Sequence, residues 1–401
     1  MNARRLIALS FVVAVPAAAQ DVLLPSAGWG LGTTISAWYF ATPISQSGGD
    51  IQAVAQVAVP FRVRAALGTW SIDLTGAGAY GAAALKSSSS SSSASSDGGD
   101  DTRVVTVGGA TDVKLRLTGP FLLDRTQLTV GINAPTGKTG LSADETTALR
   151  NLAAPALHMP VGAFGAGTGF TLGLVRAFEG EDWAVAVGGS VEQRTEYSPI
   201  ALALTSGKVE TKVTPGTALH ATAGLDRGMG EGRFSLLVTG DLFSKDKVRV
   251  TGGSADDYTL GPQFTATSRF DLAASGWRES TIDLGVRLRS QYSDSSGTSV
   301  AGSGGTYVEG SIGGIRGGPL GTGFIIGGNA RWHSGLTFTD ALVGAATTAA
   351  GVSLGFEKST AASATRFVVH AEYGTFDTGK TSTAGYNFTM GLSVTPRRPV
   401  R

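Results

Sequence analysis

Apolar and polar residues alternate with a period of two along most of the chain. In the segment Ile282–Arg289 every second residue is aliphatic, and the positions between them carry Asp283, Gly285, Arg287 and Arg289. Three further segments repeat the arrangement: Val113–Thr118, Trp183–Arg194 and Arg366–Tyr373. A period of two predicts β-strands that each have one apolar face and one polar face.

The pattern predicts about sixteen strands, with fourteen as the alternative. Their predicted starts lie near Trp29, Ile51, Trp70, Arg103, Thr126, Gly165, Trp183, Thr217, Arg233, Tyr258, Glu279, Thr306, Gly321, Gly351, Thr365 and Tyr386. Short links alternate with long ones, and the long ones include Lys86–Thr102, Pro135–Phe164, Ser198–Pro215, Ser293–Gly304 and Ser334–Ala349. Such alternation with an even strand count is typical of bacterial outer-membrane barrels and predicts that both termini are periplasmic.

Charges of both signs stand in the middle of many predicted strands, which favours a membrane barrel over a soluble β-sandwich. In a sandwich the charged face looks at water and the strands are usually shorter. No apolar stretch after residue 19 is long enough for a membrane-spanning helix, and a closed barrel is the other structure that satisfies backbone groups in lipid. We therefore predict an all-β, transmembrane, antiparallel up-and-down barrel with a polar lumen.

The six tryptophans fall near predicted strand ends. Trp29, Trp70, Trp183 and Trp277 stand at the starts of strands that follow short links, whereas Trp38 and Trp332 lie near the opposite ends of theirs. Because indole favours the membrane–water interface, this placement predicts two interfacial belts.

The N-terminus predicts export. Two arginines precede an apolar run that ends in three alanines before Gln20, which is the pattern of a secretory signal peptide. We expect a signal peptide at residues 1–19, a short periplasmic segment at 20–28, the barrel at 29–396 and a tail at 397–401. The expected location is the outer membrane of a Gram-negative bacterium.

Composition and motifs give no sign of catalysis. The chain has no cysteine, so thiolate chemistry and disulfides are excluded, and its near-neutral charge argues against nucleic-acid binding. The four histidines lack metal-ligand spacing. Pro135-Thr136-Gly137-Lys138-Thr139 resembles the end of a phosphate-binding loop, but Ile132 stands where that loop needs its first glycine. We expect no enzyme activity and no cofactor.

Charged residues on the polar strand faces are the candidate lumen residues. They include Arg62, Arg64, Asp112, Lys114, Arg116, Glu192, Arg194, Arg269, Asp283, Arg287, Arg289, Arg331, Arg366 and Glu372. Paired across strands, they would form a structural ladder that fills the barrel. Unpaired, as a basic stripe, they would favour anionic solutes. The mixed signs favour the ladder.

The link Pro135–Phe164 is the longest and carries many apolar residues. Ser142 and Glu145 form a capping-box pattern that predicts a short helix ending before Pro155. The candidate constriction residues are Leu149, Leu152, Leu157 and Met159. This link either folds into the barrel mouth and narrows it, or packs on neighbouring loops outside.

Three segments resemble outer-membrane proteins of meta-pathway phenol degradation, which are similar in style to fatty-acid and aromatic-hydrocarbon transporters. The segments are Gly109–Arg116, Leu128–Lys138 with its Pro-Thr-Gly, and the glycine-rich Val161–Gly167. The resemblance covers about the second quarter of the chain and implies a barrel that admits small, often hydrophobic solutes. The chain departs from fatty-acid transporters because no N-terminal hatch precedes the first strand, and its last strand lacks a terminal aromatic residue.

The sequence thus predicts an outer-membrane channel that passively admits small solutes, including hydrophobic or aromatic compounds. The alternatives are a structural or adhesion-type barrel with a side-chain-filled lumen and, third, an outer-membrane enzyme. The expected partners are outer-membrane lipid and lipopolysaccharide, a small-molecule solute and the barrel assembly machinery.

Overall fold

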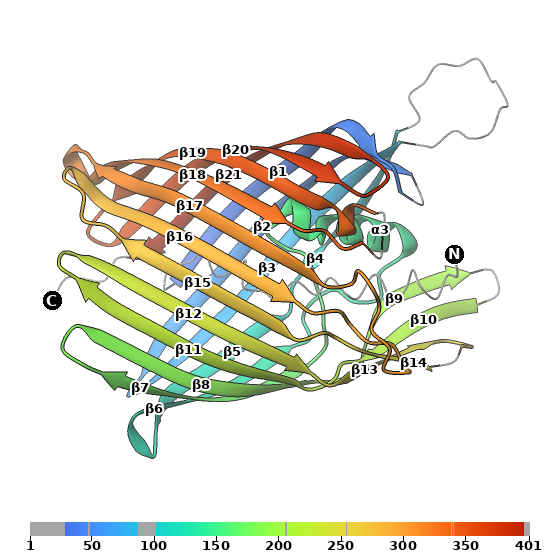
Figure 1. Cartoon of the computed structure of the whole chain (residues 1–401), viewed down its shortest axis with the longest axis horizontal. Coiled ribbons are helices and arrows are strands. Elements are labelled where there is room, and N and C mark those ends of the chain that lie inside the picture. Colours follow the sequence, from blue (N-terminus) through green and yellow to red (C-terminus); the bar gives the residue numbers. More distant parts are fainter. Residues whose placement is uncertain are drawn as a thin grey trace.

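The computed structural model describes residues 29–46, 49–86, 102–204, 207–253, 255–337, 339 and 341–396. The predicted signal peptide, N-terminal segment and C-terminal tail lie outside these residues. The described chain forms a closed antiparallel barrel of sixteen strands (Figure 1), which confirms the predicted fold class. Closure occurs where β1 (Trp29–Ile44) pairs with both β2 (Asp50–Leu67) and β21 (Ser382–Pro396).

The other barrel strands follow one another in chain order. They are β3 (Trp70–Lys86), β4 (Thr102–Ala110) with β5 (Val113–Phe121), β6 (Leu123–Ala134), β7 (Gly169–Glu179), β8 (Trp183–Arg194), β11 (Ala218–Met229), β12 (Gly232–Phe243), β15 (Gln263–Asp271), β16 (Trp277–Arg289), β17 (Gly305–Gly317), β18 (Thr322–His333), β19 (Ala346–Ser359) and β20 (Ser363–Asp377). β4 and β5 both pair with β3 and are two halves of one strand, interrupted at Thr111 and Asp112.

Two of the long links contain strands that the sequence pattern did not predict. β9 (Tyr197–Leu204), β10 (Gly207–Thr214), β13 (Lys245–Val250) and β14 (Ala255–Thr259) form a separate four-stranded sheet. It lies beyond the barrel at the end where the long links are, here called the long-loop end (Figure 1). The strand predicted to start near Tyr258 consequently begins at Gln263, because Tyr258 belongs to β14 of this outer sheet.

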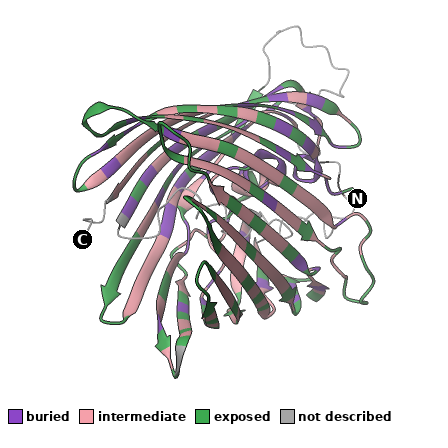
Figure 2. Ribbon diagram, turned by 60° about the vertical axis from the view of Figure 1, so that its left-hand side comes forward, coloured by how far each residue is buried: buried purple, intermediate pink, exposed green. Residues whose placement is uncertain are grey.

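The outer surface of the barrel is apolar. Its exposed side chains include Leu31, Ile35, Tyr39, Val57, Phe170, Leu172, Leu219, Ile312, Ile326, Val352 and Phe388. Exposed and covered positions alternate as bands along the strands (Figure 2). A closed barrel with such a surface is the architecture of a bacterial outer-membrane protein, since lipid replaces water around it.

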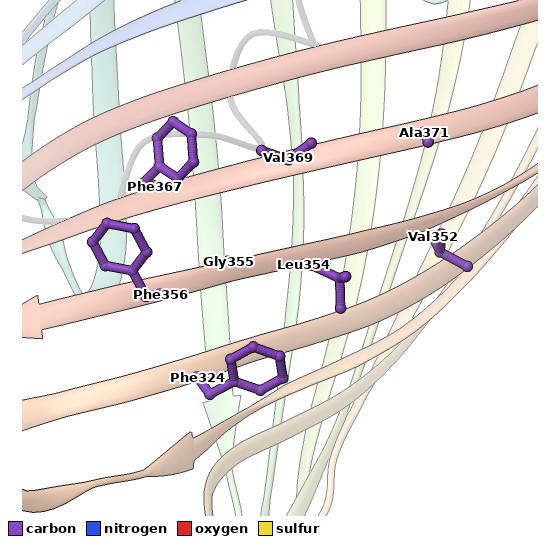
Figure 3. Close-up of a pocket in the computed structure, with 8 residues that line it drawn as sticks. All are labelled: Phe324, Val352, Leu354, Gly355, Phe356, Phe367, Val369 and Ala371. Atoms are coloured by element: carbon purple, nitrogen blue, oxygen red, sulfur yellow. The ribbon is translucent and has the colours of Figure 1, made fainter.

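One region of this surface, on β18–β20, is hollowed and purely carbon-lined. Phe324, Val352, Leu354, Phe356 and Phe367 project there from neighbouring strands (Figure 3). These residues face lipid and belong to the apolar belt.

The predicted tryptophan belts are correct in part. Trp183 and Trp277 are exposed where their strands leave the short turns, and Trp332 is exposed near the long-loop end. Trp38 contradicts the prediction because it is only 1% exposed and its indole Nε1 donates to the Leu157 carbonyl inside the barrel. Within the described residues, no helix is long and apolar enough to cross a membrane.

The apolar belt yields a first prediction. Val352 lies mid-strand on the outer face of β19, so Val352→Arg should destabilise the folded barrel by roughly 2–4 kcal/mol through the cost of a charge in lipid. The matched control is Thr267→Arg, at an exposed mid-strand position on the inner face of β15, which should change stability far less. Equilibrium unfolding in urea of the vesicle-reconstituted protein measures both; equal losses would contradict the assignment of faces.

Candidate functional site: the barrel lumen and its inner loop

The barrel encloses a segment, residues 135–168, that joins β6 to β7 and is here called the inner loop. Its base is held by Asp112, in the interruption between β4 and β5. The two carboxylate oxygens of Asp112 accept backbone N–H groups from Gly137, at 2.8 Å, and from Ala166, at 2.7 Å. Asp112 is 8% exposed, so it holds both ends of the loop and does not face the lumen as a free charge.

Glycines let the two ends of the loop approach each other at this base. A Cβ on Gly137 would come within 2.6 Å of both the Gly165 Cα and the Asp112 carboxylate. A Cβ on Gly165 would meet the Gly137 and Lys138 carbonyl oxygens at 2.9 Å. The Gly165 N–H donates to the Lys138 carbonyl at 3.1 Å. Larger residues would therefore force the two loop ends apart.

From this base the loop forms the predicted helix, α3 (Ala143–Leu152), followed by the 3₁₀ turn η1 (Pro155–Leu157). Both hydrogen bonds of the predicted capping box, between Ser142 and Glu145, are present. Leu152 at the end of α3 packs on Gly81 of β3, where a Cβ would lie 2.3 Å from a Leu152 methyl carbon. The helix thus lies against the inside of the wall.

Side chains of three wall strands bind the backbone of the loop. Trp38 of β1 donates to the Leu157 carbonyl at 2.9 Å. Gln56 of β2 donates to the Val161 carbonyl at 2.7 Å and accepts the Val161 N–H at 2.8 Å. Arg331 of β18 donates to the Ala156 carbonyl at 2.7 Å. These bonds replace water as partners for buried backbone groups, which a segment inside a barrel otherwise lacks.

Arg331 also forms a buried ion pair. Its Nε and Nη2 donate to the two Glu372 carboxylate oxygens at 2.7 and 3.1 Å, and its guanidinium lies 5.5 Å from the centre of the Trp38 ring. Arg331 is 5% exposed and Glu372 is 8% exposed. A bidentate pair in this setting fixes the guanidinium so that its remaining Nη1 points at the loop.

An apolar cluster fills the space between the loop and the wall. It joins wall residues of β1–β4 and β20 to the loop. Of the four candidate constriction residues, Leu152, Leu157 and Met159 are buried in this cluster and Leu149 packs against it from a half-buried position. These four side chains are directed into the packed layer, so the backbone and the remaining side chains of the loop form its lumen surface.

The inner wall therefore has two halves. Inward positions on β1–β4 near the long-loop end are buried under the loop, including Phe40, Val54, Ala83, Val105 and Val107. Inward positions on β8, β11 and β12 are partly or fully exposed, and even the inward-facing Leu237 is 47% exposed. Leu237 has this exposure because no other part of the described chain covers it. The open half of the lumen is bordered mainly by β6–β8, β11, β12 and β15–β17.

The predicted lumen charges fall into three groups. Asp112, Arg331 and Glu372 support the loop, as described above. Arg62, Arg64, Arg116, Arg269, Asp283 and Arg366 lie from the middle of the wall toward the end with the short turns. Lys114, Glu192, Arg194, Arg287 and Arg289 line the open half from its middle to the long-loop end.

At least seven of these fourteen charges form a salt bridge: Arg62, Glu192, Arg194, Arg269, Arg331, Arg366 and Glu372. Arg62 Nε donates to Asp73 at 2.9 Å, Arg194 Nε to Glu192 at 2.6 Å and Arg269 Nε to Asp271 at 2.8 Å. Near the short turns, Arg366 donates to the buried Glu357 and to Glu279. Arg62–Asp73 and Arg366–Glu357 join neighbouring strands, as the rungs of a ladder would, whereas Arg194–Glu192 and Arg269–Asp271 each lie within one strand.

The motif that resembled a phosphate-binding loop has a structural role. Its Lys138 binds the Glu145 carboxylate, and its Gly137 belongs to the loop base. The histidines also fit a structural interpretation: His220 pairs with Asp241 at 2.7 Å and His370 with Ser353 at 2.9 Å. In the part of the chain that the structure describes, no three metal-binding side chains gather.

Sequence reasoning missed Trp38 and Gln56 as supports of the loop. Their signal was parity: Trp38 and Phe40 alternate with the outward Tyr39 and share the face of Ser36. Large apolar residues on a lumen face indicate something packed against it.

The contacts at the loop base yield a second prediction, about how firmly the inner loop is held in place. Asp112→Ala removes acceptors for two backbone N–H groups and should destabilise the closed loop by roughly 1–3 kcal/mol for each orphaned donor. Limited proteolysis between residues 140 and 160 should accelerate, whereas Asp73→Ala near the short turns should leave the rate unchanged. Identical protection in both variants would contradict the role given to Asp112.

The buried ion pair between Arg331 and Glu372 yields a third prediction. Removing one partner, as in Glu372→Leu, should cost roughly 3–5 kcal/mol because the Arg331 charge is left uncompensated. The double variant Arg331→Met with Glu372→Leu should recover most of that loss. Unfolding free energies from a double-mutant cycle measure the coupling, and additive losses would contradict it.

Comparisons with known proteins found similar barrel structures but no protein family. No protein-family model matches the chain, and no curated protein does. Among solved structures, CdiB from Acinetobacter baumannii is similar with a TM-score of 0.45 and 11% identity over 92% of this chain, which spans 60% of CdiB. OprB from Pseudomonas putida gives 0.45 and 10% over 92% and 93% of the two chains, and the channel DcaP from A. baumannii gives 0.37 and 12% over 92% and 98%. Likenesses of this size carry no argument about function.

Proposed function

We propose that this protein is a passive channel for small solutes across the outer membrane, with its bore set by the inner loop. The observation that supports the proposal is the division of the inner wall. One half is sealed by the loop, whereas inward side chains of the other half, such as Leu237, are accessible to solvent. A lumen filled by its own side chains would bury both halves alike.

The loop determines the size of the opening because it is firmly supported. Asp112 binds the base of the loop. Trp38, Gln56 and Arg331 bind its far end, between residues 156 and 161. An inner loop held this way narrows the passage without closing it, which makes passage dependent on solute size.

The proposed solutes are small molecules, including hydrophobic or aromatic compounds. The support is the resemblance to meta-pathway phenol-degradation barrels. The three segments of this chain that carry the resemblance meet at the base of the inner loop. Gly109–Arg116 contains Asp112, and the Pro-Thr-Gly and glycine-rich segments supply the two N–H groups that it accepts. We further propose that the short turns and both termini face the periplasm, as an even strand number allows, and that lipopolysaccharide and the barrel assembly machinery are the partners.

The test is the removal of the inner loop. Replacing Leu141–Met159 by a short Gly-Ser linker should raise single-channel conductance in planar bilayers about twofold or more, because the covered half of the lumen opens. Deleting residues 295–298 from the β16–β17 link, which lies outside the barrel, is the control and should leave conductance unchanged.

The competing function is a structural barrel without a passage. A folded, heat-modifiable wild-type barrel with no conductance would establish that alternative. Conductance that is equal in wild type and loop deletion would contradict the role of the loop in setting the bore.

A further inference from the structure

Arg287 has a different setting from the other lumen arginines. It stands on the inner face of β16, directly opposite Tyr307 of β17, and Tyr307 in turn pairs with His333 of β18. The Arg287 guanidinium carbon lies 5.8 Å from the centre of the Tyr307 ring. One wall region near the long-loop end thus carries a cation, a phenol and an imidazole side by side.

Within the described residues, the charge of Arg287 has no carboxylate partner. Arg62, Arg194, Arg269, Arg331 and Arg366 each form a salt bridge. Among the described residues Arg287 forms none, and its buried Nε has no hydrogen-bond partner. The nearest acidic side chain on β17, Glu309, accepts the Tyr307 hydroxyl at 2.9 Å instead.

A second cation adjoins Arg287 on the same strand face. Arg289 lies two residues further along β16, and its Nη2 donates to Gln263 at 3.1 Å. Two arginines at this spacing point to the same side of a strand and repel each other. An anion bound between the strand and the lumen would relieve this repulsion and complete the hydrogen bonds of Arg287.

The inner loop supplies an aromatic side chain to the same region. His158 adopts left-handed backbone angles, φ 54° and ψ 40°, between the buried Leu157 and Met159. This turn directs its side chain away from the packed layer, so His158 is exposed while both neighbours are buried. Its ring lies 6.1 Å from the Tyr307 ring, at an angle of 47°.

We propose that Arg287, Tyr307 and His158 form a binding site in the lumen for a small aromatic carboxylate. This inference rests on the proposed channel function and names one class of solute for it. The carboxylate takes the planar, two-pronged contact that a guanidinium offers. The ring lies against the edges of His158 and Tyr307, which prefer offset or edge contacts with another ring.

These contacts distinguish aromatic carboxylates from neutral aromatic molecules and from short aliphatic acids. A neutral aromatic molecule keeps the ring contacts but leaves Arg287 unpaired, whereas a short aliphatic acid keeps the charge contact but loses the rings. Both should bind more weakly than the aromatic acid. The site borders the open half of the lumen because β16 and β17 line it and the tip of the inner loop ends there.

The experiment measures binding and current separately. Benzoate is titrated into the detergent-solubilised full-length barrel by calorimetry, and is added to single channels in planar bilayers, with acetate and benzyl alcohol as comparison probes. Arg287→Gln should weaken benzoate binding about tenfold or more, as expected for loss of a charged hydrogen-bonding partner. Arg269→Gln, at a paired arginine nearer the short turns, should leave binding unchanged.

His158→Ala tests the aromatic part independently of the strand. It should weaken benzoate and leave acetate unaffected, and heat-modifiability checks that each variant is folded. Equal benzoate affinity in wild type, Arg287→Gln and His158→Ala overturns the site, even if the channel conducts. Absence of conductance with intact, Arg287-dependent benzoate binding overturns the channel function and leaves the site standing.

Discussion

A chain segment that runs inside a barrel must find partners for its backbone polar groups, and the wall of this barrel provides them from side chains. Asp112 accepts two N–H groups where the inner loop leaves and rejoins the wall, while Trp38, Gln56 and Arg331 serve its far end. Without these contacts each buried backbone group would cost free energy. The interruption of β4–β5, the glycines of the base and the buried ion pair all follow from that need.

Because of this arrangement, the two halves of the inner wall have different roles. The half beneath the loop is an apolar interface of the kind found inside soluble domains. The half opposite keeps polar side chains in contact with water, and its Arg194 and Arg269 pair with carboxylates of their own strands. Paired charges stiffen the wall and exert little net field. Arg287, which forms no salt bridge with any described residue, therefore differs from the arginines around it.

The barrel itself was predictable because each strand has to present apolar residues to lipid at every second position, and a pattern of this kind is local. Strand starts at Trp70 and Trp183 were predicted to the residue for this reason. The capping box at Ser142 was predictable because it, too, depends only on residues that are close in sequence. Contacts between distant segments were not predictable. The alternation pattern places Asp112 on the lumen face of its strand, and only the fold shows that it binds Gly137 and Ala166. Trp38 was misassigned because a tryptophan near a strand end fits both the membrane interface and a packed inner face.

The central claim is that the inner loop covers one half of the inner wall and leaves the other half open. The chain has no cysteine, so single cysteines report on each half without background. Ala83→Cys places a thiol on β3 beneath the loop, and Thr222→Cys places one on the inner face of β11 in the open half. Labelling rates with a charged, water-soluble thiol reagent should be fast at position 222 and strongly suppressed at 83. Equal rates at the two positions would contradict the account.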